Sequence, residues 1–307
     1  MMQNNPRKPL FACLMSFVLP GFGQLYNGEA NKGIWIFLGF AFLSIPGGAA
    51  IAIYLHGTAM LIALLVSLLS TIAIWLYGIV DAGRCAAMKQ TYQPLAWQSS
   101  GMYVLTFVLC NALALPIIIS EVRNHEVEAF RIPSASMSPT LLPGDFIFVD
   151  KRYNCPGCKY SIKRGDVVIL TNPNDRTIYY IKRIIGLPGD RLQISGHTIL
   201  VNGKSLSLQE TMSPTGTQIT EGDAVHQWQV LWSHSNDLFP ELSLTVSAGQ
   251  VFVLGDNRSN SVDSRVIGTI PLQDVLGKAR RIWLSTNGHE VRWNRLGQGI
   301  EPENIFP

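Results

Sequence analysis

The sequence predicts two parts of different architecture: an N-terminal α-helical transmembrane region, residues 1–120, and a mainly β domain, residues 121–307. The 307-residue chain is 47% apolar and only 15% charged, a balance typical of membrane proteins. No Asp, Glu, Lys or Arg occurs from residue 33 to residue 80, and most charged residues follow residue 120. Beyond that point, long apolar segments give way to short runs of β-branched and aromatic residues.

The N-terminal region contains apolar segments at residues 10–26, 34–55, 58–80 and 102–120. The last three are about the length that crosses a bilayer as a helix. The first contains Pro20 and Gly21, so we expect it either to cross the bilayer or to re-enter on the same side. The sequence therefore predicts three to four membrane segments.

A glycine-rich stretch, residues 20–28, looks like the turn of small two-helix membrane modules. We interpret it as a packing element, because small residues let membrane helices approach closely. A partner-binding appendage is the alternative.

The short loops of the membrane region carry Lys32 in one place and Arg84 with Lys89 in another. All three fall on one side by parity, and positive charge favours the cytoplasm. Residues 121–307 are therefore expected outside the cytoplasm. The net charge of +3, without a basic run, does not indicate a nucleic-acid partner.

The second half shows strand patterns separated by turn signals such as Asn202-Gly203. Strands are expected at residues 146–149, 166–171, 178–185, 191–194, 198–201, 250–254 and 279–284. With no long amphipathic helix between them, they predict a sandwich or a partly open barrel. Residues 205–248 are interpreted as a variable insertion with its own hairpin.

Three stretches occur in a fixed order: FRIPSASMSPT at residues 130–140, YYIKRIIGLPGD at 179–190 and GDNRSNSVDSR at 255–265. Together they resemble the sequence boxes of bacterial type I signal peptidases, which are membrane-anchored serine proteases with a Ser–Lys pair. The resemblance extends from residue 121 to the C-terminus, apart from the insertion. It implies an endopeptidase that removes signal peptides and needs no metal or other cofactor.

The resemblance also implies roles for individual residues. Ser136 matches the nucleophile and Lys182 the general base. Ser134 matches the residue whose hydroxyl helps to form the oxyanion hole, and Ser261 the residue that orients the lysine amine. The chain has Ala135 where the usual pattern has Gly, which could adjust this turn.

Lys182 has two interpretations on physical grounds alone. In a strand it shares one face with Tyr180 and Ile184. Its amine could extend to solvent along that face. Alternatively, it could be held among apolar groups, where burial would lower its pKa.

Other residues of the three stretches are assigned supporting roles. Four charged residues are expected to form a buried structural ion-pair network: Asp256, Arg258, Asp263 and Arg265. Three apolar residues are expected to wall the substrate pocket: Ile132, Phe146 and Ile181.

The expected substrates are exported preproteins with small residues, typically Ala-x-Ala, before the cut. The resemblance places the chain in the inner membrane of a bacterium as a multi-pass protein, with its catalytic domain on the periplasmic side. The apolar flanks of the serine stretch could also contact membrane lipid.

Cys155 and Cys158 enclose a Pro-Gly pair. They could form a small disulfide loop outside the membrane, or half of a zinc site. The disulfide is favoured, because no further ligands lie close in the sequence.

The sequence alone leaves two alternative functions open. The chain could be another Ser–Lys membrane protease, such as a conjugation-type pilin-processing peptidase, or an inactive membrane scaffold. Self-cleaving repressors are disfavoured, because they carry a DNA-binding module and lack membrane segments.

Overall fold

The computed structural model describes residues 6–55, 57–154, 161–213, 216–223, 226–233 and 241–300. The chain divides into two units, Met1–Asn124 and His125–Pro307. Each is described by itself. Cys155 and Cys158, the expected disulfide pair, lie outside the described residues.

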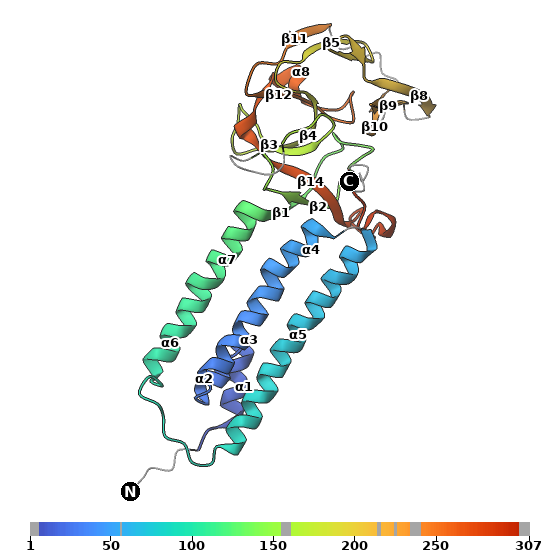
Figure 1. The fold of residues 1–307 in the computed structure, drawn as a ribbon. Coiled ribbons are helices and arrows are strands. Elements are labelled where there is room, and N and C mark those ends of the chain that lie inside the picture. The colour runs from blue at the N-terminus through green and yellow to red at the C-terminus, as the bar shows by residue number, and fades with distance from the viewer. Residues whose placement is uncertain are drawn as a thin grey trace. The chain divides into compact units, whose positions relative to one another are not determined.

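The N-terminal unit is built of helices that run alongside one another (Figure 1). They are α1 (Pro9–Val18), α2 (Phe22–Tyr26), α3 (Ala30–Phe42), α4 (Gly48–Tyr54), α5 (Gly57–Met88), α6 (Ser100–Val108) and α7 (Leu115–Glu121). π-helical turns at Leu43–Gly47, Leu109–Ala114 and Val122–Glu126 continue the neighbouring helices. Three continuous helices, Ala30–Tyr54, Gly57–Met88 and Ser100–Glu126, are long and apolar enough to cross a membrane. The prediction of N-terminal apolar helices is confirmed.

The first apolar segment is broken in the middle. Helix α1 ends at Val18, and Gly21 adopts a left-handed conformation with φ of 85° before α2 begins. A ten-residue helix is about 15 Å long, because each residue adds 1.5 Å. That is about half of the ~30 Å hydrocarbon core, so α1 cannot cross a bilayer by itself.

The glycine-rich stretch at residues 20–28 packs against α5. A Cβ atom on Gly23 would lie 2.2 Å from the Ala12 carbonyl oxygen and 2.7 Å from the Ala82 Cβ. The Gln24 side chain donates to the Gly78 carbonyl (2.8 Å), and that of Asn27 to the Ala82 carbonyl (2.8 Å). Small residues and amide side chains together hold this turn onto the long helix.

The second unit is mostly antiparallel β structure, as the sequence predicts. Its strands are β1 (Val127–Arg131), β2 (Asp145–Asp150), β3 (Val167–Thr171), β4 (Tyr179–Gly186), β5 (Arg191–Ser195), β6 (Thr198–Val201), β7 (Lys204–Ser205), β8 (Ser207–Ser213), β9 (Gly216–Gly222), β10 (Gln227–Trp232), β11 (Leu242–Thr245), β12 (Gln250–Leu254), β13 (Ile270–Pro271) and β14 (Val275–Ser285). A short helix, α8 (Ser264–Ile267), follows β12.

The strands form three sheets. The largest has the order β1-β2-β14-β3-β4-β12-β13, and the others are β10-β9-β8 and β11-β5-β6-β7. Strand β4 contributes to all three apolar clusters of this unit, through Ile181, Ile184 and Ile185. From Ile181 onward, the residues of β4 are therefore buried on both faces of the strand.

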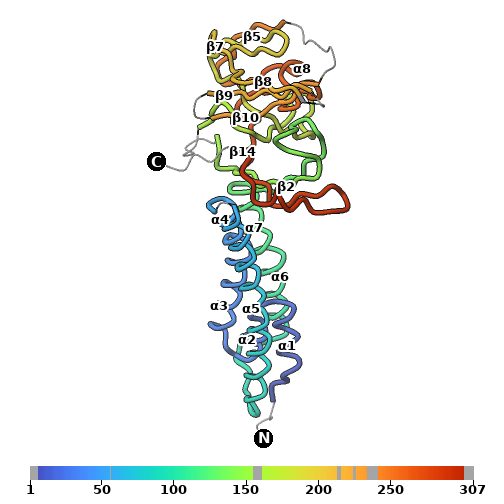
Figure 2. Tube along the Cα trace, turned by 90° about the vertical axis from the view of Figure 1, so that its right-hand side faces the viewer, coloured from blue at the N-terminus to red at the C-terminus, as the bar shows by residue number. Residues whose placement is uncertain are grey.

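The segment interpreted as an insertion is part of this core. Strands β8, β9 and β10 run together as a meander (Figure 2). Ile219, Val230 and Trp232 from this meander pack with Ile185 of β4 in one cluster. Strand β11 pairs with β5 in another sheet.

Candidate active site

The first two stretches singled out in the sequence meet around one serine. Ser136 lies in the loop between β1 and β2, which we call the serine loop (residues 132–144), and is half-buried. The Lys182 amine, from β4, donates to the Ser136 hydroxyl at 3.2 Å. A hydroxyl and an amine separated by 46 positions are thus within hydrogen-bond distance.

Lys182 is buried rather than extended to solvent, with 3% of its surface exposed. Its amine also donates to the Ile181 carbonyl (2.9 Å) and lies 5.2 Å from the centre of the Tyr180 ring. The pKa of Lys182 falls from its ordinary 10.5 to about 8, mainly because burial disfavours the ammonium form. Negative charge on Asp263 and Asp256 opposes this shift.

The third stretch holds the serine loop in place. The Asn257 N–H donates to the Ser136 carbonyl (3.1 Å), and the Asn257 side chain donates to the Ala135 carbonyl (3.1 Å). Further along the loop, the Thr140 hydroxyl donates to Asp256 at 2.5 Å. The nucleophile candidate is therefore held by backbone and side-chain bonds on both sides.

The four charged residues of the expected network are all paired, but only Asp263 and Arg265 pair with each other. Arg183 forms a two-pronged pair with Asp256 at 2.8 and 2.6 Å, and both side chains are buried. Arg265 pairs with Asp263 at 2.7 Å. Arg183 follows the candidate base directly in the sequence, and that adjacency is the signal that could have identified it.

Arg258 pairs with the buried Glu221 of β9, which lies in the segment interpreted as an insertion. Trp228 of β10 donates its indole N–H to the same carboxylate at 3.1 Å. No sequence pattern signals this partnership, because the two charges are 37 positions apart. The insertion is therefore bonded directly to the stretch that holds the serine loop.

Ser134 is exposed, and its hydroxyl oxygen lies 3.2 Å from that of Ser136. The buried Ser261 hydroxyl has no hydrogen-bond partner among the described residues. It lies close to Gly255, because a Cβ atom built there would come within 2.2 Å of the Ser261 oxygen and 2.6 Å of the Ser136 carbonyl oxygen. Gly255 thus lets the third stretch approach the serine loop.

Of the three residues expected to wall the substrate pocket, two lie together and the third lies on another face. Ile132 and Ile181 share an apolar cluster with Met137, the neighbour of Ser136. On β2, Ile147 and Val149 face this cluster, whereas Phe146 contacts the Trp283 ring at 5.5 Å. Because side chains alternate along a strand, Phe146 lies on the opposite face of β2. Within the described part of the chain, no group of three His, Cys, Asp or Glu side chains could hold a metal ion.

An antiparallel β unit that brings a serine hydroxyl to a buried lysine amine is suited to proton transfer. Comparison with known proteins defines the class. Residues 102–284, more than half of the chain, match the family described as signal peptidase, peptidase S26.

The chain is 34% identical to a signal peptidase I from Rickettsia typhi over 225 residues, which cover 61% of this chain and 80% of that protein. It is 31% identical to a signal peptidase I from Buchnera aphidicola, over 62% of this chain and 80% of the relative. A crystal structure of a signal peptidase I from Enterococcus faecalis is 27% identical, covering 38% of this chain and 95% of that chain with a TM-score of 0.28.

The chain therefore belongs to the peptidase S26 family of signal peptidases. It is a bacterial type I signal peptidase, a hydrolase that processes the signal peptides of exported preproteins.

The close approach at Gly255 generates the first prediction. Gly255→Ala places a methyl group against Ser261 and the Ser136 carbonyl, so the serine loop must shift. We expect preprotein cleavage to fall by at least tenfold, because small misplacements of reacting groups are costly. Cleavage by the detergent-solubilised protein measures this effect.

Gly249→Ala is the control. Gly249 precedes β12 and has open space around it, although its φ of 74° is strained for alanine. This variant should lose some stability and keep its activity. Activity within twofold of wild type for Gly255→Ala would contradict the prediction.

Proposed function

We propose that this signal peptidase cleaves preproteins with Ser136 as the nucleophile and the neutral Lys182 amine as the general base. The observation that carries the proposal is the 3.2 Å contact between the Lys182 amine and the Ser136 hydroxyl in a buried setting. A nucleophilic hydroxyl needs an adjacent base, and a desolvated amine can serve as one.

In the first step, the Ser136 oxygen attacks the scissile carbonyl carbon while the Lys182 nitrogen takes the hydroxyl proton. The resulting oxyanion would accept hydrogen bonds from the Ser136 N–H and the Ser134 hydroxyl, which lies 3.2 Å from the Ser136 oxygen. Donors fixed in advance stabilise the charge that develops in the transition state.

The tetrahedral intermediate then collapses. The carbon–nitrogen bond breaks, Lys182 returns its proton to the leaving amine, and the acyl group remains on Ser136. A water molecule attacks this ester while Lys182 takes a proton from it. The bond to the Ser136 oxygen then breaks, Lys182 returns that proton to the oxygen, and the signal peptide leaves with a carboxyl group that ionises in solvent.

Ser261 is proposed to orient the Lys182 amine. Its buried hydroxyl has no partner within the described residues and lies near the Ser136 backbone. Asp256, Asp263 and their arginine partners stay structural in this proposal, because each is engaged in an ion pair.

We further propose that the protein is a multi-pass inner-membrane enzyme whose β unit lies on the periplasmic side and contacts membrane lipid. The three long apolar helices support anchoring. Lys32 in the first turn of α3, Arg84 near the end of α5 and Lys89 just beyond it support the orientation, since positive charge at the ends of membrane helices favours the cytoplasm. The substrates would then meet the site after export.

Removing either member of the pair tests the proposal. Ser136→Ala and Lys182→Met should each abolish cleavage, and the double variant should lose little more, because the two side chains act as one unit. Lys182→Met should unfold at the same temperature as wild type or higher, since it places an apolar chain in a buried position. Strong residual cleavage in either folded variant would refute the assignment.

The pH dependence follows from the Lys182 pKa of about 8. Only the neutral amine is a base, so kcat/KM should rise with pH and level off above that value. At pH 6 it should be roughly a hundredfold below the plateau, because only about 1% of the amine is neutral two units below its pKa. A flat profile between pH 6 and 9 would exclude this lysine as the base.

The substrate proposal concerns the residues one and three positions before the cut. In an extended peptide these side chains point the same way, and we propose that they contact Ile132 and Ile181, which belong to one apolar cluster. We expect preproteins with Ala-x-Ala to be cleaved, and a bulky residue at either alanine to reduce cleavage by well over tenfold, because it would have to displace packed side chains. A peptide library measures this preference. Equal cleavage of large residues would contradict it.

A further inference from the structure

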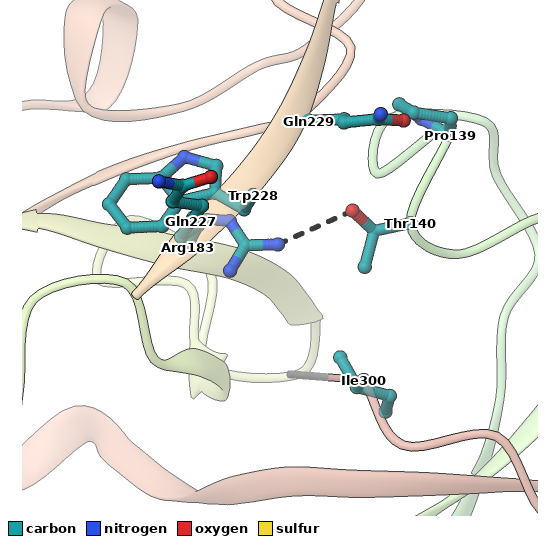
Figure 3. A pocket seen from close by; sticks show the side chains of 7 residues that line it. All are labelled: Pro139, Thr140, Arg183, Gln227, Trp228, Gln229 and Ile300. Atoms are coloured by element: carbon teal, nitrogen blue, oxygen red, sulfur yellow. Dashed lines mark hydrogen bonds between the residues drawn. The ribbon is translucent and has the colours of Figure 1, made fainter. Parts of the chain in front are cut away.

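Next to the serine loop lies a cavity of about 240 Å³ that the proposed chemistry leaves unused. It is lined by residues from the serine loop, β4, β10 and the segment after β14: Pro139, Thr140, Arg183, Gln227, Trp228, Gln229 and Ile300 (Figure 3). The cavity is smaller than the ~300–1,000 Å³ usual for drug-sized ligands, so it suits a peptide side chain better than a cofactor.

One wall of the cavity, made by Trp228, Arg183 and Thr140, is held by contacts within the protein. Trp228 is buried, and its indole N–H is bonded to Glu221. The Arg183 guanidinium lies 5.1 Å from the centre of the Trp228 ring and donates to Thr140 at 3.3 Å (Figure 3). A preformed site of this kind loses little conformational entropy on binding.

Strand β10 forms one side of the cavity and is the outer strand of its sheet. Its register with β9 pairs Trp228 with Glu221 and Gln229 with Thr220. The Asp223 N–H donates to the His226 carbonyl, so His226 is hydrogen-bonded to the β9 side. Every second residue of β10 after it, Trp228 and Val230, then bonds to β9 as well. Gln227, Gln229 and Leu231 therefore direct their backbone groups away from β9.

At Leu231, the edge of β10 pairs with the third stretch. The Leu231 N–H donates to the Asp256 carbonyl, and the Leu231 carbonyl accepts from the Arg258 N–H, each at 2.8 Å. Between them, Asn257 donates to the Ser136 carbonyl. The edge of β10 is thus joined to the nucleophile by backbone bonds. Among the described residues, the backbone groups of Gln227 and Gln229 have no partner on this side.

The serine loop connects the expected pocket for the residues before the cut, at Ile132, to this cavity, which Pro139 and Thr140 line. Ile132 opens the loop and is bonded to Asp145 at the start of β2. Thr140 lies beyond Ser136 and is bonded to Asp256. A peptide that enters past Ile132 and crosses Ser136 would continue toward Pro139, Thr140 and β10.

We propose that the segment of the substrate that follows the cut binds here as an extended strand, pairing with the β10 edge at Gln227 and Gln229. One of its first four side chains enters the cavity beside Trp228. This inference rests on the proposed Ser136 chemistry and extends it to the mature side of the preprotein. Strand addition supplies affinity through main-chain bonds, and the cavity supplies selectivity.

The test uses the full-length detergent-solubilised protein and two peptides with the same signal region. One ends as an amide one residue after the cut, and the other continues for six residues. Gln229→Trp fills the cavity from an exposed position and keeps the backbone N–H. Gln209→Trp is the matched control, because Gln209 is also exposed and lies in the same row of the sheet, across Thr220.

Wild type should cleave the longer peptide with the higher kcat/KM. Gln229→Trp should lower kcat/KM for the longer peptide at least tenfold and leave the shorter one within twofold, whereas Gln209→Trp should change neither. Equal loss on both peptides, or no loss on the longer one, would overturn the proposal and leave the edge to another occupant, such as a second protein. If Gln229→Trp does not fold, Gln227→Trp on the same edge gives the same test.

Failure of the proposed Ser136 chemistry would give a different result. Ser136→Ala would then still cleave both peptides, whatever the β10 variants do. The two proposals can therefore fail separately.

Discussion

The burial of one amine is the constraint on which the rest of the site depends. Lys182 lies on a strand whose neighbouring isoleucines belong to three apolar clusters, so only 3% of its surface is exposed. Water is thereby replaced by packed hydrocarbon, and the pKa of Lys182 falls to about 8. A β domain core thus supplies a base near neutral pH without a histidine. Stability and chemistry share the same residues, since loosening this core would return the amine to its ordinary pKa.

A base is useful only if the hydroxyl stays within its reach. The serine loop is held by Asn257 at the Ser136 carbonyl and by Asp256 at Thr140. These residues are in turn held by Arg183 and by the strand that contains Leu231. Buried ion pairs add little net stability, but breaking one leaves an uncompensated charge. Their value here lies in fixing the loop that carries Ser136 relative to β4.

The β8–β10 meander illustrates how a segment without recognisable motifs can belong to an active site. Glu221 neutralises Arg258, and Trp228 bonds the same carboxylate while forming a wall of the cavity. In the N-terminal unit, similar close packing relies on small residues: Gly23 lets its turn approach Ala12 and Ala82, and amide side chains satisfy carbonyls of α5. In each unit, a glycine lets two segments come close together, and hydrogen bonds hold them there.

The sequence by itself determined the division into apolar helices and β strands, because both signals are local: charge-free runs and alternating β-branched residues. It also identified Ser136 and Lys182 as candidates through ordered stretches that resemble a known family. Only the tertiary structure decided that Lys182 is buried, that Arg258 pairs with Glu221, and that Phe146 faces away from Ile132. Burial, long-range pairing and strand register arise from contacts between distant segments, and a linear pattern does not specify which segments meet.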